Sequence, residues 1–160
     1  ETLYSKILGE AREQGLVYGM ASGFGQYKSF IDWGIIAQVQ QENLPALFEI
    51  IVRQLKKIKS GDVDDADIEA AKQYALGRYQ RGAQTVGGVM AGYSSRYFFE
   101  GGVTDYFAYP ERLKKVKKAK VTEVMQAMFE DNIWGLGILG TANAELRALA
   151  EEKVSSLWQP

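Results

Sequence analysis

Apolar residues recur along the chain at two different spacings, and each spacing predicts a type of secondary structure. Residues 3–13 carry apolar side chains at helical spacing, and this pattern stops at Gly15. Residues 16–24 and 30–40 have the pattern of strands, and the short linker between them favours an antiparallel hairpin. In the second strand the apolar residues alternate with polar ones and share one face; they are Ile31, Trp33, Ile35, Ala37 and Val39. The apolar face of this sheet is therefore expected to pack against another element.

A single apolar stripe over residues 44–59 predicts a helix that covers this face. The stripe consists of Leu44, Leu47, Phe48, Ile51, Leu55 and Ile58. Asn43 stands where an N-cap is expected, Pro45 lies in the first turn, and lysines precede Gly61 at the end where the helix dipole is negative. Both ends of this helix are therefore marked in the sequence.

The rest of the chain predicts more helices and a third strand. The expected segments are a long helix opening near residue 64, an interruption marked by Gly82, Gly87 and Gly88, a helix to about residue 99, a lysine-rich helical stretch from residue 111, a short helix capped by Thr122, a strand over residues 133–140 and a last helix over residues 143–157. Because the first strands are adjacent and the helices cluster in sequence, the pattern predicts an α+β fold. We expect residues 1–160 to form a single domain.

Composition and charge exclude several classes of function. The chain is 46% apolar and 24% charged, as folded domains are, and its net charge of -1 provides no field that would hold nucleic acid or an anionic membrane. No stretch has the roughly 18 apolar residues of a membrane span. Without His or Cys the chain cannot build a His/Cys metal site, a Ser-His-Asp triad or a disulfide. The lack of Cys is compatible with cytoplasm or periplasm, so the compartment stays open.

Four local features have a structural and a functional interpretation. Residues 135–140 spell G-x-G-x-x-G inside an apolar run, which favours close strand packing over a dinucleotide site. The lysine run over residues 114–120 is either a solvated helix face or a patch for an acidic partner. The aromatic residues between 93 and 109 either pack internally or form a pocket for a peptide side chain. The aspartates of residues 62–67 lack the glycine and glutamate of an EF-hand loop, so we interpret them as helix-capping residues.

Small residues alternate along the three predicted strands. They are Gly19, Ala21, Gly23, Gly34, Gly135 and Gly137. If these positions share one face of the sheet, that face is bare of side chains, and we expect another domain to approach it closely. An amphipathic pattern that starts almost at residue 1 agrees with this, and we expect the chain to be a piece of a longer protein.

Residues 5–20, S-K-I-L-G-E-A-R-E-Q-G-L-V-Y-G-M, resemble the signature of the pitrilysin/insulinase-type zinc peptidases, the group that includes mitochondrial processing peptidase. The elements that follow have the family's order. They are the hairpin, the helix of residues 44–59, the link G-D-V-D-D-A-D-I into a long helix, and K-V-T-E-V before a short helix and the strand I-W-G-L-G-I-L-G. The resemblance thus covers nearly the whole chain.

The resemblance implies a two-layer α+β domain whose antiparallel sheet has helices packed on one face. Family members pair two such domains around a chamber that encloses an extended peptide. Their zinc is held by HxxEH and a distant Glu in the N-terminal domain. Since this chain has no His, it resembles the later part of the non-catalytic C-terminal domain. Its implied partners are an N-terminal zinc-binding domain, in the same or a partner chain, and an extended peptide substrate.

The resemblance also implies two substrate-binding residues, because in active members an Arg and a Tyr of this signature hold substrate at the zinc site. Tyr18 matches the Tyr directly. Arg12 matches the Arg if one residue is deleted between Arg12 and Gly15, and without this gap Ala11 takes the place. The gap matters because one helical position is about 100° of rotation. The alternatives are an ordinary strand aromatic at Tyr18 and a solvent-exposed arginine at Arg12.

These observations favour one function and leave one alternative. The expected function is that of a non-catalytic C-terminal domain of a zinc-dependent metallopeptidase, which closes the proteolytic chamber and binds substrate peptide. No catalysis and no cofactor are expected in this chain alone, and zinc is implied in the partner domain. The alternative is a structural or assembly subunit derived from an inactive member of the same family. An HxxEH motif in the sequence upstream of this segment would distinguish the two.

Overall fold

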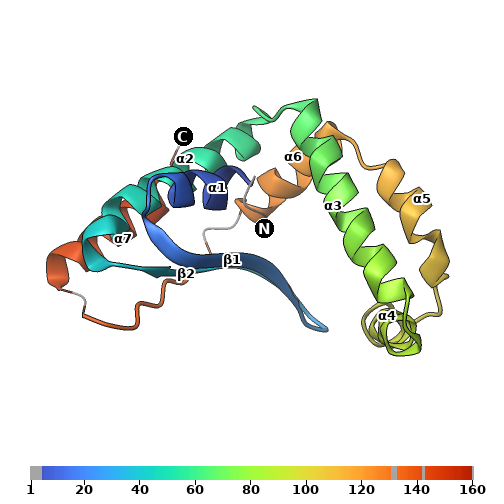
Figure 1. Cartoon of the computed structure of the whole chain (residues 1–160). Helices are drawn as coiled ribbons and strands as arrows, with labels where there is room; N and C mark the ends of the chain where they lie inside the picture. The colour runs from blue at the N-terminus through green and yellow to red at the C-terminus, as the bar shows by residue number, and fades with distance from the viewer. Residues whose placement is uncertain (1–4, 131–132, 142, 160) are drawn as a thin grey trace. The chain divides into compact units, whose positions relative to one another are not determined.

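The computed structural model describes residues 5–130, 133–141 and 143–159. The elements in this part of the chain are α1 (Lys6–Glu13), β1 (Val17–Gln26), β2 (Ile31–Val39), the 3-10 helix η1 (Gln41–Asn43), α2 (Leu44–Ser60), α3 (Asp65–Ala83), α4 (Val86–Glu100), the 3-10 helix η2 (Tyr106–Ala108), α5 (Tyr109–Lys114), α6 (Lys118–Met128) and α7 (Ala144–Ser155) (Figure 1). The fold is α+β, as predicted. Of the predicted first helix, residues 3 and 4 lie outside the described residues.

The chain divides into two compact units. The first comprises Glu1–Gly25, Asp32–Asp62 and Thr122–Pro160, and the second comprises Gln26–Ile31 and Val63–Val121. The single domain expected for residues 1–160 stays a prediction. No helix in the described ranges is long and apolar enough to cross a membrane.

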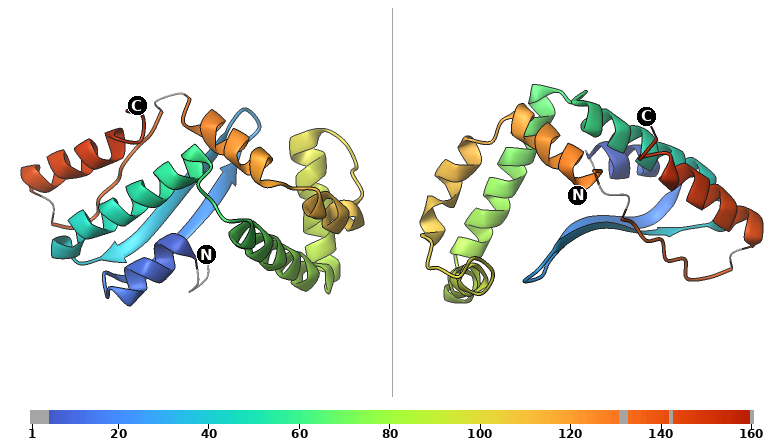
Figure 2. Two further views of the ribbon diagram at one scale, coloured as in Figure 1. Left: turned by 90° about the horizontal axis from the view of Figure 1, so that it is seen from above. Right: turned by 180° about the vertical axis from the view of Figure 1, so that it is seen from behind.

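The first unit has two layers. β1 and β2 pair as an antiparallel sheet, and α1, α2 and α7 cover one face of it (Figures 1 and 2). α2 lies between α1 and α7 and packs against both (Figure 2). The core of this unit consists of Ile7, Ala11, Leu47, Ile50, Val52, Leu55, Phe129 and Leu157. The predicted arrangement of a sheet with helices on one face is therefore confirmed.

The strands and α2 form where the apolar pattern places them. Four of the five alternating residues of the second strand, Trp33, Ile35, Ala37 and Val39, pack against the core, while Ile31 is exposed. Of its predicted stripe, α2 buries Leu47, Phe48 and Leu55, while Leu44, Ile51 and Ile58 are half-buried. It also buries Ile50 and Val52, because α1 and α7 flank it on both sides. Asn43 precedes α2 as expected but makes no capping bond there; its Nδ2 donates to the carbonyl oxygen of Leu16 at 3.4 Å.

Two predictions for the later part of the chain are wrong. Residues 133–139 do not form a strand. Strands need a neighbour for their backbone groups, glycines weaken them, and here Trp134 stacks on Trp158 with ring centroids 6.1 Å apart instead of entering the sheet. Thr122 does not cap a helix, because α6 already begins at Lys118. The last helix is confirmed: Asn143 caps α7 by accepting a hydrogen bond from the Leu146 amide at 2.8 Å.

The second unit is built around Tyr106. The predicted interruption between two long helices is confirmed, since α3 ends at Ala83 and α4 begins at Val86. Tyr106 is buried, with its ring 5.0 Å from that of Tyr79 in α3 and 5.9 Å from that of Tyr93 in α4. Tyr106 thus packs internally, whereas Tyr97, Phe98 and Phe107 are exposed, and a pocket for a peptide side chain stays a prediction.

Candidate functional site

Both predicted substrate-binding residues lie at the junction of α1 and β1. Gly15 follows α1 with a φ of +66°, a left-handed conformation that glycine adopts without strain. The Gly15 amide donates to the carbonyl oxygen of Arg12 at 2.9 Å, and the Leu16 amide donates to that of Ala11 at 2.8 Å. These bonds fix the path of the chain out of the helix, with Arg12 before the turn and Tyr18 after it.

Tyr18 is the second residue of β1, and its side chain is 87% exposed. Val17 and Met20 on either side pack against the core, so the strand itself is held in place. The phenol therefore stands on a supported strand and is accessible to a ligand. A role in substrate binding stays a prediction.

Arg12 and Ala11 have different environments although they are adjacent. Ala11 is fully buried in the core, whereas Arg12 is exposed in the last turn of α1. Only Arg12 therefore has a side chain that a ligand can reach, but its match to the family's arginine stays a prediction. In the part of the chain that the structure describes, no hydrogen bond or cation–π contact joins Arg12 to Tyr18.

Helix α1 is held on α2 by a carboxylate that the sequence analysis did not single out. Glu10 accepts hydrogen bonds from the guanidinium of Arg53, from Nε2 of Gln54 at 3.2 Å and from Nε2 of Gln14 at 3.2 Å. The bond from Arg53 is the main cause that holds the pKa of Glu10 below its ordinary value, and partial burial opposes it. The same bond raises the pKa of Arg53. We call the contacts of Glu10 with Arg53 and Gln54 the Glu10 clamp. They hold α1 against α2 and so fix the point at which β1 begins.

The exposed surface of the sheet is open and has little charge. The two strands contain one charged residue, Asp32, and its carboxylate accepts a hydrogen bond from the Gly25 amide at 2.8 Å. Besides Tyr18, the large exposed apolar side chains of the two strands are Phe24, Ile31 and Ile36. A Cβ added at three of the predicted small positions, Gly19, Gly23 and Gly34, would find no atom within 4 Å. These three positions on two strands are thus open, and their place on one shared face stays a prediction.

Ile36 was missed because the sequence analysis followed only the core-facing alternation of this strand. The signal was there in the adjacent pair Ile35 and Ile36, since one of two neighbouring strand residues must face away from the core. With 74% of its surface exposed, Ile36 extends the apolar surface from β1 onto β2. Gly135 and Gly137 do not extend it, because their segment is not a strand.

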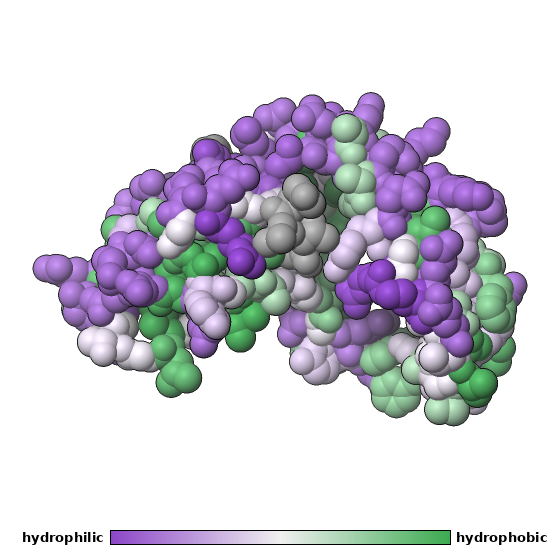
Figure 3. Space-filling view, viewed as in Figure 1, coloured by the Kyte–Doolittle hydropathy of each residue, from purple (hydrophilic) through white to green (hydrophobic). Residues whose placement is uncertain are grey.

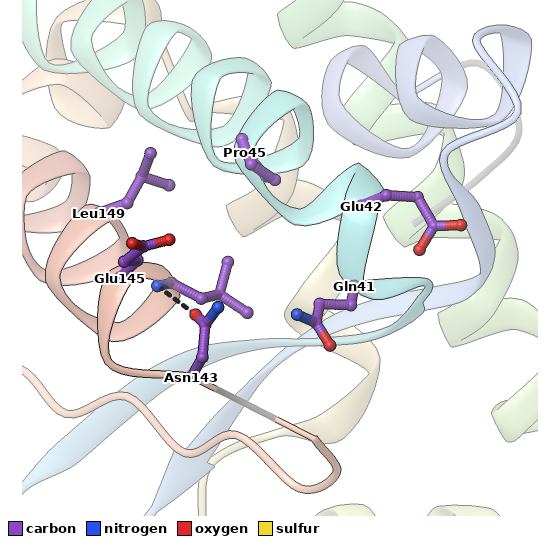
Figure 4. Close-up of a pocket in the computed structure, with 7 residues that line it drawn as sticks. Gln41, Glu42, Pro45, Asn143, Glu145 and Leu149 are labelled. Carbon is purple, nitrogen blue, oxygen red and sulfur yellow. Dashed lines mark hydrogen bonds between the residues drawn. The ribbon is translucent and has the colours of Figure 1, made fainter.

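A shallow pocket of about 380 Å³ lies where α2 and α7 begin (Figure 4). Its lining includes the carboxylates of Glu42 and Glu145, and Asn143 at its edge is engaged in capping α7 (Figure 4). These carboxylates lie at the positive ends of their helix dipoles, where acidic residues stabilise a helix. The pocket therefore has a structural explanation.

The lysine run and the aspartates are both solvent-facing. Lys114 pairs with Glu111 at 2.7 Å within α5, and both side chains are about two-thirds exposed. Asp64 precedes α3 without a side-chain capping bond, while Asp65 and Asp67 lie in its first turn. Among the described residues no group of three His, Cys, Asp or Glu side chains is arranged to hold a metal ion.

Comparison with known families gives one match. Residues 1–74 match the family model described as the Peptidase M16 inactive domain. This part of the chain is therefore similar to that domain. The matched residues contain the Glu10 clamp, both strands, α2 and the first half of α3. The resemblance over the remaining residues stays a prediction, and the comparison with curated proteins finds no match.

Proposed function

We propose that this chain is the non-catalytic C-terminal part of a zinc-dependent metallopeptidase, in which it closes the proteolytic chamber and binds substrate peptide. The observation that carries the proposal is the open surface of β1 and β2. It carries exposed Tyr18 and Ile36, its one charged residue is Asp32, and Gly34 leaves the backbone of β2 accessible. An extended peptide can approach such a surface closely.

Within this function Tyr18 has a definite chemical role. Its phenol donates a hydrogen bond to a peptide carbonyl oxygen and contributes most where negative charge develops on that oxygen. Arg12, exposed at the end of α1, contributes a second donor that positions the peptide. Neither group replaces a metal ligand, so the partner that we propose is a zinc-binding N-terminal domain of the same or a partner chain. That domain supplies the Lewis acid that polarises the scissile carbonyl.

The test is made in the complete two-domain peptidase, with a fluorogenic peptide as substrate. Tyr18→Phe removes one hydroxyl from an exposed ring, and we expect kcat to fall by roughly 10–1,000-fold with unchanged folding. Arg12→Ala should mainly raise KM, because a contact made equally in ground and transition state affects binding alone. The control is Tyr97→Phe, an equally conservative change of an exposed tyrosine in α4.

The alternative function, a structural or assembly subunit, predicts a different outcome. In that case the parent protein cleaves no peptide, and Tyr18→Phe leaves assembly unchanged. Wild-type kcat and KM in the Tyr18→Phe enzyme would refute the role of this phenol. Equal losses in Tyr18→Phe and Tyr97→Phe would show that the effect does not come from the sheet surface.

A further inference from the structure

A second surface of the first unit follows α2 between its two neighbouring helices. An open groove of about 820 Å³ runs over the outward face of α2, with α1 along one side and α7 along the other. Its lining includes Ala46, Ile50 and Arg53, which follow one another at helical spacing along α2, with Ile50 buried in the core. Hydrophilic side chains gather over these helices (Figure 3).

The groove is cationic although the whole chain has a net charge of -1. Its cations are Arg53, Lys56, Lys57 and Lys153, and its carboxylates are Glu10 and Glu49. Each carboxylate is already paired with a cation of the groove: Glu10 with Arg53, and Glu49 with Lys153 at 3.0 Å. Within the described ranges no ion pair includes Lys56 or Lys57. The groove thus presents a positive charge that its own carboxylates do not cancel.

Stabilisation of the α2 dipole does not account for this arrangement. A helix dipole acts on charges within the last turn, where Lys57 lies. Arg53 lies further from the C-terminus of α2, and Lys153 comes from α7. Cations from two helices that converge on one concave surface are instead the pattern of a binding groove for negative charge.

We propose that this groove binds an acidic peptide segment of a partner protein. A peptide can space its carboxylates to meet Lys56 and Lys57, the two lysines of the groove that make no ion pair among the described residues. A nucleic acid fits less well, because its evenly spaced phosphates would also meet the carboxylates of Glu10 and Glu49. This proposal does not depend on peptide binding at the sheet, which lies on the other side of α2.

The experiment measures binding of a fluorescein-labelled, glutamate-rich dodecapeptide to the full 160-residue chain by fluorescence anisotropy at low ionic strength. The variant is Lys56→Glu with Lys57→Glu, and Lys56→Gln with Lys57→Gln serves as a milder form. Circular dichroism verifies that each variant is folded. The matched control is Lys114→Glu with Lys115→Glu, the same charge reversal in the lysine run of the second unit. A lysine-rich dodecapeptide and a single-stranded oligonucleotide are the comparison ligands.

We expect the glutamate-rich peptide to bind, and added salt to weaken the binding. The Lys56/Lys57 reversal should lower the affinity by at least about tenfold, and the Lys114/Lys115 reversal should change it by less than about twofold. Three results would overturn the proposal. They are equal binding of the two peptides, equal losses in both reversals, and tighter binding of the oligonucleotide than of the glutamate-rich peptide.

Discussion

The carboxylate of Glu10 in α1 accepts a hydrogen bond from the guanidinium of Arg53 in α2, a residue 43 positions later in the chain. Gln54, the next residue of α2, adds a second bond to the other carboxylate oxygen. Because α1 leads through Gly15 into β1, this clamp fixes the point at which the strand carrying Tyr18 begins. A charge-assisted contact between α1 and α2 thus stabilises the helices that cover the opposite face of the sheet from the proposed peptide-binding surface.

Glu10→Gln should lower the free energy of unfolding by roughly 0.5–1 kcal/mol near neutral pH, since Arg53 is half exposed and solvent screens the pair. The effect should depend on pH. The pKa of Glu10 is lower in the folded than in the unfolded chain, so its contribution is complete above the ordinary glutamate pKa. It is lost as the pH falls through the folded-state pKa. Denaturant titrations from about pH 7 to about pH 3 should show the wild type and Glu10→Gln converging in stability.

Glu111→Gln is the matched control for this prediction. The hydrogen bond from Lys114 also lowers the pKa of Glu111, but the pair lies within α5 and joins no two elements. Its removal should leave the unfolding midpoint nearly unchanged. A difference between wild type and Glu10→Gln that stays constant down to low pH would contradict the assignment of the clamp.

Leu55→Ala should destabilise the first unit by about 2–5 kcal/mol, because Leu55 is 4% exposed on the face of α2 that covers the sheet. The control is Ile36→Ala on the exposed surface of β2, which should change the free energy of unfolding by less than about 0.5 kcal/mol. Equal effects in chemical denaturation would mean that the two faces of the sheet are assigned the wrong way round.

Two glycines of α4 should respond to alanine with opposite signs. A Cβ at Gly92 would collide with the ring of Tyr106, so Gly92→Ala should cost about 1–3 kcal/mol. A Cβ at Gly87 would meet no atom within 4 Å, and Gly87→Ala should stabilise the helix by up to about 1 kcal/mol. Thermal melting of both variants checks this. A stable Gly92→Ala protein would show that Tyr106 is not packed against α4.

The sequence predicted the elements whose pattern is local. The hairpin, α2 and the helices of the second unit were visible in alternation, helical spacing and breaks at glycine, because those signals come from residues near one another in the chain. The strand expected over residues 133–140 failed for the opposite reason. Whether an apolar run becomes a strand depends on a partner elsewhere, and here Trp134 finds Trp158 instead.

The candidate site shows the same division. Tyr18 could be singled out from a sequence signature, and its exposure follows from its place in a half-covered strand. The contact between Glu10 and Arg53 could not be predicted, because nothing near either residue indicates that α1 and α2 lie side by side. The cationic groove could not be predicted either, because Lys153 lies beside the charged residues of α2 only when α7 packs against that helix.

The central claim is that the exposed surface of β1 and β2 binds an extended peptide. The most direct test is a titration of the isotope-labelled 160-residue chain with an uncharged, apolar dodecapeptide, followed by amide chemical shifts. The account predicts that the shifts change along β1 and β2, at Tyr18, Gly19, Gly34 and Ile36. Ile36→Lys should abolish these changes. The control Val86→Lys, at an exposed valine of α4, should leave them in place. Shift changes confined to the helices, or no changes at saturating peptide, would contradict it.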